Sequence, residues 1–344
     1  MAFKGTRSRP KPEEISGTIE SMGGILNAGT EQELTVYWCK VAQPHFKESL
    51  GLLIDMIRNS LFEKESIEKE RMVVIEELNM IYDYPNYRVE ALVDELLWPN
   101  HALGRDIGGT KESVTNITRK AMLGYMDSHY IPSNTVISIA GNISHSQLTS
   151  EVTQLTNDWR AKASPEWEPF LEHPPGPRFK LEYRKTEQLH LSIAVPGVSL
   201  LHPQKYVLDL LSIILGEGMT SRLFLEVREN RGLAYDIRSD VTYFKDCGAL
   251  IVTAGVDPKR VYDATSIILE QMSSMQDSVT SIELERAKQQ AIGRMMLRLE
   301  DTRAVSSWMG NQELLTNKVL NTCLLYTSDA ADDTPCVDLG GRRI

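Results

Sequence analysis

The sequence predicts an α+β chain made of two related domains. Segments with strand composition alternate with amphipathic helical segments along the chain, and one short stretch occurs twice. SIEKER at residues 66–71 returns as SIELER at residues 281–286, a spacing of 215 residues. In both places the stretch follows a strand and a helix and opens a long helix. A chain of 344 residues can bury two cores. A repeat of this length indicates a duplicated domain rather than a solenoid.

Proline marks the boundary between the two domains. Residues 161–180 contain SPEWEP and HPPGP and show little hydrophobic periodicity, which is typical of a linker. We therefore expect a first domain over residues 1–160 and a second over residues 181–322.

The end of the chain is expected to be foreign to the fold. Residues 323–333, CLLYTSDAADD, resemble the translation of a transposase adaptor used in short-read DNA library preparation. Residues 336–344, CVDLGGRRI, likewise resemble read-through into the flanking primer. The alternative is an ordinary polar tail. We expect residues 323–344 to be a non-native tail and leave them out of the fold prediction.

Caps, breakers and strand formers predict the elements of the first domain. Pro10 and Pro12 favour a helix start, Gly23 and Gly24 a helix end, and Pro85 cannot continue the long helix. Helices are expected over 11–22, 44–59, 66–84, 89–97, 113–129 and 144–158, strands over 23–30, 34–41 and 135–140, and a polar loop over 101–109.

The second domain repeats this alternation of strands and helices. Its last predicted helix begins with a capping box, in which Thr280 and Glu283 stand three residues apart. Strands are expected over 188–195, 233–242 and 248–255, helices over 204–215, 259–274 and from 280 onward, and a turn over 216–223.

Charge and composition exclude several classes of protein. The net charge of −10, or −8 without the four Asp and two Arg of residues 323–344, argues against a nucleic-acid-binding protein, and no basic patch is interleaved with aromatic residues. No apolar run is long enough to span a bilayer. The cysteines and histidines show no metal-ligand or redox spacing. They are Cys39, Cys247, Cys323, Cys336, His45, His101, His129, His145, His173, His190 and His202.

The long helix that begins near residue 66 carries the candidate chemistry. Glu70 and Glu77 stand two helical turns apart and point the same way. The helical neighbours of Glu77 are all apolar, and a carboxylate among them is costly to bury without a positive partner. They are Val73, Val74, Met80 and Ile81. A metal ion, a basic partner or a solvated position at the helix edge would each resolve this conflict.

Two motifs resemble the insulinase/pitrilysin family of inverted-zinc metallopeptidases, in particular the mitochondrial processing peptidase β type and its bacterial homologues. MAFKGT at residues 1–6 resembles the segment that follows the family's H-x-x-E-H motif, and ERMVVIEEL resembles the family's E-R-x-V-I-x-E pattern. The resemblance implies that the motif with both His ligands and the general-base Glu stands before Met1. We expect the chain to be truncated there. The fold it implies is two homologous domains, each an antiparallel sheet with helices packed on one face.

The resemblance also implies roles for the two glutamates. A catalytic zinc ion needs three protein ligands and an open position for water. Glu77 falls where the family has its third ligand, and Glu70 is carried over as a catalytic acid that orients or assists. Glu76 is a weaker candidate for the ligand.

The repeat supports one metal-binding domain and one degenerate copy. A shift of 215 residues takes Glu70 to Glu285 and Glu77 to Ile292. The motif implied before Met1 would fall on residues 211–215, LSIIL, which have no ligating side chain.

Further site residues are carried over from the same family. Asn27, Ala28 and Gly29 lie in the segment that resembles its substrate-binding edge strand, although Asn27-Ala28 is also compatible with a simple turn. Arg228 and Tyr235 resemble its Arg…Tyr pair, which binds a peptide carbonyl and the oxyanion. The alternative places Arg228 in a surface ion pair and Tyr235 in the core.

The function implied is that of a Zn²⁺-dependent metalloendopeptidase that holds peptides or unfolded segments as an added β-strand. Without the H-x-x-E-H motif, this chain is expected not to hydrolyse peptides. The resemblance implies a homodimer or a pairing with a homologous subunit, and cytoplasmic localisation if the source is bacterial. One alternative is a non-catalytic scaffold or partner subunit of the same family. A carboxylate-pair hydrolase using Glu70 and Glu77 is the other.

Overall fold

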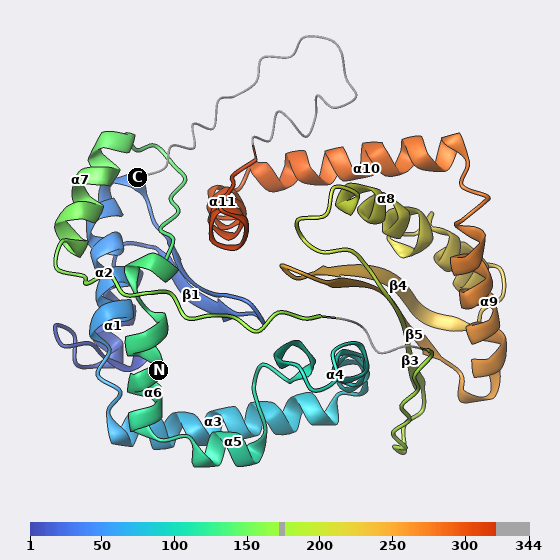
Figure 1. Ribbon diagram of the computed structural model, residues 1–344, viewed down its shortest axis with the longest axis horizontal. Helices are drawn as coiled ribbons and strands as arrows, with labels where there is room; N and C mark the ends of the chain where they lie inside the picture. The colour runs from blue at the N-terminus through green and yellow to red at the C-terminus, as the bar shows by residue number, and fades with distance from the viewer. Residues whose placement is uncertain (172–175, 321–344) are drawn as a thin grey trace, which may run out of the picture. The chain divides into compact units, whose positions relative to one another are not determined.

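The computed structural model describes residues 1–171 and 176–320, which form two compact units (Figure 1). Unit 1 comprises Met1–Leu78, Ile107–Trp167 and the chain from Leu297 onward, and unit 2 comprises Asn79–Asp106 and Glu168–Met296. Each unit therefore draws on both halves of the chain, and the predicted domain limits at 160 and 181 stay a prediction. The predicted tail over residues 323–344 lies outside the described residues.

Unit 1 is a two-stranded hairpin with helices around it. Its strands and helices are η1 (Ala2–Lys4), α1 (Pro12–Glu20), β1 (Ile25–Thr30), β2 (Thr35–Lys40), η2 (Gln43–His45), α2 (Phe46–Asn59), most of α3 (Lys64–Asp83), α5 (Lys111–Asn116), α6 (Arg119–His129), η4 (Pro132–Asn134), α7 (His145–Thr156) and α11 (Thr302–Thr316).

The hairpin has a fixed register. β1 and β2 are antiparallel, with Asn27 opposite Trp38 and Ala28 opposite Tyr37. At the turn, the N–H of Glu31 donates to the carbonyl of Leu34 over 2.8 Å. Antiparallel ladders alternate between hydrogen-bonded and non-hydrogen-bonded pairs. Counting back from this bond, the hydrogen-bonded pairs are 29/36, 27/38 and 25/40.

One face of the hairpin forms the core of unit 1. Ile15 and Ile19 of α1 and Leu52 and Met56 of α2 are all at most 1% exposed and pack together there, with β1 and β2 residues beside them. The other face of β2 contacts α11, where the Arg303 guanidinium lies 3.7 Å from the centre of the Trp38 ring. Helical segments far apart in sequence therefore contact both faces of the hairpin.

Unit 2 is built on a three-stranded antiparallel sheet of order β3-β5-β4. Its elements are the end of α3, α4 (Pro85–Leu97), η3 (Ala102–Gly104), β3 (Leu189–Pro196), α8 (Lys205–Gly216), the π-helical turn η5 (Phe224–Glu229), β4 (Ala234–Tyr243), β5 (Gly248–Val256), η6 (Pro258–Arg260), α9 (Val261–Ser274) and α10 (Ser281–Leu299).

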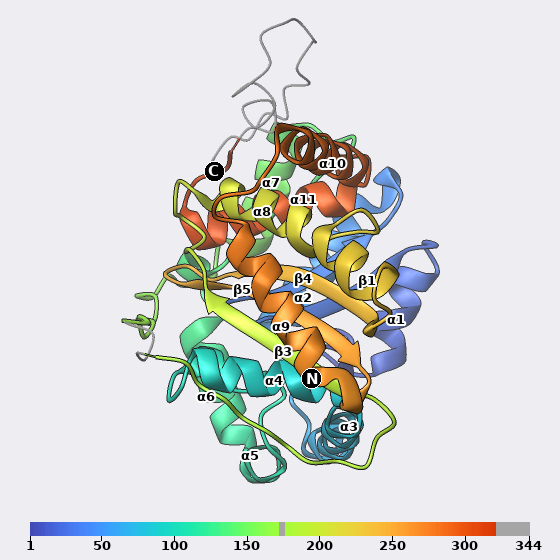
Figure 2. The same ribbon diagram turned by 90° about the vertical axis from the view of Figure 1, so that its right-hand side faces the viewer.

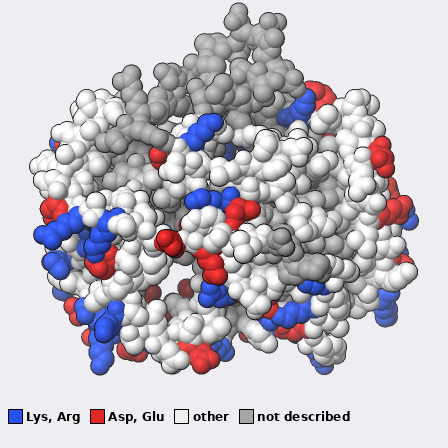
Figure 3. Space-filling view, in the orientation of Figure 1, with Lys and Arg blue, Asp and Glu red and all other residues white. Residues whose placement is uncertain are grey.

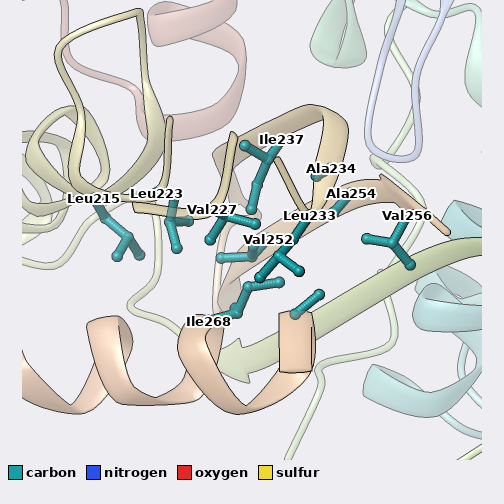
Figure 4. Close-up of a cluster of buried hydrophobic side chains, with 11 residues drawn as sticks. Leu215, Leu223, Val227, Leu233, Ala234, Ile237, Val252, Ala254, Val256 and Ile268 are labelled. Carbon is teal, nitrogen blue, oxygen red and sulfur yellow. The ribbon is translucent and has the colours of Figure 1, made fainter. Parts of the chain in front are cut away.

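Both faces of this sheet are covered. α8, η5 and α9 pack on one face, and Figure 2 shows α9 lying across the strands. The buried cluster between them includes Leu215, Val252 and Ile268 (Figure 4). On the other face, Leu97 and Trp98 at the end of α4 pack against Ala249 of β5. The predicted α+β class with antiparallel sheets is confirmed, and α4 adds a helix on the second face.

The element positions reproduce the 215-residue repeat. Adding 215 to the bounds of α2 gives 261–274, which are the bounds of α9, and the shifted α3 and α4 give 279–298 and 300–312, close to α10 and α11. The shifted β2 falls within β5. α4 contacts the sheet of unit 2, and α11, its counterpart, contacts the hairpin of unit 1. The two copies have thus exchanged equivalent helices.

Two predicted elements differ from the structure, and one helix was not predicted. Residues 135–140 have strand composition but no ladder partner in the described part of the chain, so the predicted strand is wrong. The helix predicted over 113–129 is two helices, because Ile117 is extended and Thr118 caps α6 by accepting from the Ala121 N–H over 3.2 Å. α11 was not predicted, although its Asp301 accepts from the Arg303 N–H at the helix start over 2.8 Å.

The surface shows mixed charge. On the face drawn in Figure 3, Lys and Arg side chains lie among Asp and Glu side chains. Among the described residues, every helix is too short or too polar to cross a membrane.

Candidate functional site

α3 is held on its inner side by an arginine rather than by apolar burial. Ile67 is its one buried residue among those described. The Arg71 side chain is 14% exposed, and its guanidinium donates to the carbonyls of Val114, Thr115 and Ile117 at the end of α5. A cation satisfies the free carbonyls at a helix C-terminus and complements the helix dipole. Arg71 therefore fixes the orientation of α3.

The outer side of α3 exposes apolar side chains. Met72, Val73 and Met80 are 62%, 48% and 53% exposed. Glu77 is exposed among them, and its carboxylate makes no hydrogen bond or ion pair with another residue of the described chain. The conflict expected for a buried Glu77 is thus resolved by exposure, and the carboxylate is available to a partner.

The second copy shows what covers such a helix face. Ala287 and Ala291 of α10 pack against Ile213 and Ile214 of α8. Subtracting 215 takes these two alanines to Met72 and Glu76 of α3, on the exposed face. In copy 2 the covering helix is α8, whereas no described helix takes this place on α3.

Glu70 has a cationic partner. Its carboxylate lies 2.5 Å from the Nζ of Lys4, and the two side chains are 25% and 37% exposed. This ion pair joins η1 to α3. Glu70 stays on the same side of α3 as Glu77, as the two-turn spacing predicts.

The described residues fit only part of a zinc site. Among them, no group of three His, Cys, Asp or Glu side chains is placed to hold a metal ion. Glu77 offers one carboxylate ligand, and a catalytic zinc site needs three. The chain as described therefore does not form a complete metal centre.

The corresponding place in the second copy is an apolar core. Ile214 and Leu215 are 2% and 1% exposed. Ile292, the counterpart of Glu77, is half-buried. Buried aliphatic side chains cannot ligate a metal, which agrees with the predicted degenerate copy.

β1 offers a free strand edge. In the register above, Leu26, Ala28 and Thr30 belong to the non-hydrogen-bonded pairs, so their N–H and C=O groups point away from β2. No described strand pairs with this edge. The predicted substrate-binding residues Asn27, Ala28 and Gly29 all lie on β1, at this edge.

The two sheets treat their free edges differently. β4, the counterpart of β1, carries Asp236, Arg238 and Asp240, with the Arg238 Nε donating to Asp240 over 2.9 Å. Charged side chains on an edge strand discourage pairing with another chain. β1, with the sequence ILNAGT, has no charged side chain. β1 is therefore the edge that favours strand addition.

The structure brings Arg228 and Tyr235 together in unit 2. The Arg228 guanidinium lies 5.8 Å from the centre of the Tyr235 ring and 4.8 Å from that of Phe224. Tyr235 is 75% exposed, so the alternative of a core tyrosine is wrong. Their role toward a substrate stays a prediction.

The comparisons with known proteins identify the family. Residues 1–111 match the model described as Insulinase (Peptidase family M16), and residues 116–291 match the Peptidase M16 inactive domain. The chain is 36% identical to the "Uncharacterized zinc protease YmxG" of Bacillus subtilis over 320 residues, covering 92% of this chain and 77% of that protein. The chain belongs to the insulinase family, M16.

The chain is also similar to a further curated protein and to two solved structures. A similar protein is the "Uncharacterized zinc protease SCO5738" of Streptomyces coelicolor, 33% identical over 100% of this chain and 77% of its own length. The crystal structure of a protease from Helicobacter pylori matches with a TM-score of 0.85 at 20% identity, over 92% of this chain and 78% of that one. A chain of Complex III2 from Candida albicans matches with a TM-score of 0.75 at 20% identity, over 91% and 78%. At these identities the two structures show the shared fold alone.

The predicted family is confirmed. Residues 116–291 match a model described as an inactive domain, and the predicted limits of a degenerate second domain stay a prediction. Sequence reasoning missed two residues that shape the site. Arg71 stands in the quoted E-R motif, but nothing in the sequence shows that it binds the end of α5. Lys4, in MAFKGT, was not recognised as the partner of Glu70.

Proposed function

We propose that this chain is the peptide-holding part of an M16 zinc metalloendopeptidase. Peptides or unfolded segments bind as an added strand at the free edge of β1. Glu77 supplies one carboxylate to a zinc ion in the complete site, with Glu70 beside it. Arg228 and Tyr235 act on the substrate carbonyl at the zinc site of another subunit.

One observation carries this proposal. Of the two equivalent edges, β4 is guarded by charged side chains and β1 is not, although an unguarded edge invites aggregation. Main-chain hydrogen bonds at such an edge bind extended peptides with little dependence on sequence. That property suits an enzyme that acts on unfolded segments.

The same chain does not hydrolyse peptides alone. Zinc, when bound, would polarise the scissile carbonyl and activate water. Glu77 cannot hold the ion by itself, and the described residues provide no cluster of three ligands. We therefore expect peptide binding without turnover, with or without added Zn²⁺.

Fluorescence anisotropy tests the binding. The probe is a fluorescein-labelled peptide with the sequence of residues 35–41, TVYWCKV. Residues 35–40 of this sequence pair with β1 along its other edge in the fold itself. Ala28→Pro removes the N–H that points outward from β1, and proline is tolerated on an edge strand. We expect this variant to lose binding by about tenfold or more, since a main-chain hydrogen bond is lost and the proline ring blocks the edge.

A matched control separates the edge from a general effect of proline. Lys64→Pro places proline at the first position of α3, where the N–H is not used by the helix. This variant should bind the probe as the wild type does. Equal binding by the wild type and a folded Ala28→Pro variant would refute strand addition at β1.

The non-catalytic scaffold of the same family is the main rival. A scaffold has no use for an unguarded peptide-binding edge or for an exposed, unpaired Glu77 within an apolar face. If the probe does not bind the wild type, the scaffold accounts better for the chain.

A further inference from the structure

The side chain of Asn27 covers one backbone N–H group on the free edge of β1. Its Oδ1 accepts a hydrogen bond from the N–H of Ala28 over 2.8 Å. Asn27 is exposed, whereas Ala28 is half-buried. The bond is local, between adjacent residues, so it closes without help from the rest of the fold.

The covered N–H is one that an added strand would use. The bond from Glu31 to Leu34 sets the alternation of the ladder, and the pair Ala28/Tyr37 is therefore non-hydrogen-bonded. The Ala28 N–H points to the free edge rather than to β2. The Asn27 carboxamide thus accepts from the central one of three outward-pointing N–H groups on β1. The other two are the N–H groups of Leu26 and Thr30.

The sequence around Asn27 offers no other guard. β4 keeps its edge free of partners with Asp236, Arg238 and Asp240. β1 has no charge, no proline and no bulge in its pairing with β2. Natural edge strands are protected by such features. On β1, the neutral side chain of Asn27, which can rotate to another rotamer, takes the place of these protective features.

We propose that Asn27 is a reversible guard of the β1 edge. With no peptide bound, its carboxamide accepts a hydrogen bond from the Ala28 N–H and blocks non-specific pairing of other strands with this edge. When an extended peptide arrives, the side chain rotates away and a peptide carbonyl accepts from the Ala28 N–H instead. A peptide must therefore compete with the Asn27 carboxamide for the Ala28 N–H before it can add as a strand. This inference rests on the proposed function.

Asn27→Ala tests the guard with the same anisotropy probe, the labelled peptide TVYWCKV. Removing the competing acceptor exposes the Ala28 N–H, so we expect the probe to bind about two- to tenfold more tightly. The variant should also self-associate more, which sedimentation velocity measures. Gln32→Ala, which removes another exposed polar side chain in the adjacent turn, is the matched control and should change neither quantity.

The outcomes separate the guard from the proposed function. If Ala28→Pro abolishes binding and Asn27→Ala leaves it unchanged or weaker, strand addition stands and the guard is refuted. If the probe binds Ala28→Pro as tightly as the wild type, strand addition itself fails. Should Ala28→Pro not fold, a probe with an N-methyl group on every backbone nitrogen takes its place. Such a probe keeps no N–H donor on either edge and should not bind the wild type or Asn27→Ala.

Discussion

Asp94 shows how a single half-buried carboxyl sets the pH dependence of stability. Burial in unit 2 and the nearby charges of Glu90 and Asp106 raise the pKa of Asp94 to about 7. An unfolded aspartate has a pKa of about 3.9. The folded state therefore binds the proton more tightly than the unfolded state does. Its contribution to stability is fully present below pH ~4 and declines as the pH rises from there to about 7.

Asp94→Asn should remove this decline. We expect the variant to be more stable than the wild type at pH 8, on the order of 1–3 kcal/mol, and similar at pH 4. Urea unfolding at both pH values measures the difference. Asp277→Asn, at an exposed carboxylate, is the control and should match the wild type at both.

Glu283 has a lowered pKa, so its contribution to stability changes with pH in the opposite direction to that of Asp94. Hydrogen bonds from Arg222, at 2.7 and 2.9 Å, are the main cause that lowers the pKa of Glu283 to about 2, and burial opposes them. Thr280 adds the capping box that the sequence predicts, with its N–H donating to Glu283 over 2.9 Å. The stability this carboxylate provides is present above its unfolded pKa, near 4.3, and is lost as the pH falls toward 2.

Glu283→Gln should therefore destabilise the chain near neutral pH. We expect a loss of about 1–3 kcal/mol at pH 7, because Arg222 keeps a half-buried charge without its partner. The gap between variant and wild type should shrink below pH ~4.3 and close as the pH falls through about 2. An equal loss for Glu285→Gln, whose carboxylate is exposed, would contradict this explanation.

At the scale of elements, α3 depends on Arg71. The helix buries little apolar surface among the described residues, and the guanidinium binds three carbonyls at the end of α5. Arg71→Lys keeps the charge but loses the planar set of donors. The carbonyls of α5 then lose most of their hydrogen bonds.

Hydrogen exchange measures this effect. In Arg71→Lys, the amides of α5 and of the first turns of α3 should exchange about tenfold faster or more, which corresponds to a loss of at least ~1.4 kcal/mol of local stability. Lys69→Arg, on the exposed side of α3, is the control and should leave the rates unchanged. Unchanged rates in Arg71→Lys would show that other contacts hold α3.

Most elements could be predicted because their signals are local. The capping box at Thr280 and the proline at the start of α4 are fixed by neighbouring residues. The strand predicted over residues 135–140 fails for a non-local reason, because strand composition forms no strand without a ladder partner. The exposure of Glu77 was likewise open, since it depends on whether another helix covers α3.

The candidate site was predicted in part. The sequence and the family resemblance selected Glu70, Glu77 and the residues of β1. Lys4 and Arg71 were missed, since an ion pair between η1 and α3 or a bond to α5 has no signature in a single sequence. The hydrogen bond between Asn27 and Ala28 could not be predicted, because the direction of the Ala28 N–H depends on the register of the hairpin.

At the scale of the whole molecule, the chain contains two copies of one arrangement of strands and helices, and the two copies differ in the side chains at equivalent positions. The two copies keep the same order of elements. In copy 2, Ile214 and Leu215, where the motif proposed for copy 1 would fall, are buried aliphatic side chains. Copy 1 keeps an exposed carboxylate, that of Glu77, and an edge strand without charged side chains.

The degenerate site should not tolerate a ligand. Leu215→His places an imidazole at a position that is 1% exposed, and we expect a loss of about 3–5 kcal/mol in unfolding free energy. Leu201→His, at a position that is 58% exposed, should cost little. Denaturant unfolding compares the two, and a tolerated Leu215→His would contradict the assignment of this place to the core.

The central claim is that an extended peptide pairs with the free edge of β1. Residue-resolved hydrogen exchange, with and without saturating TVYWCKV peptide, tests it most directly. The account predicts new protection at the amides of Leu26, Ala28 and Thr30. Asn27 and Gly29, whose amides already donate to β2, should change little. Protection along β4, or at no amide of β1, would contradict it.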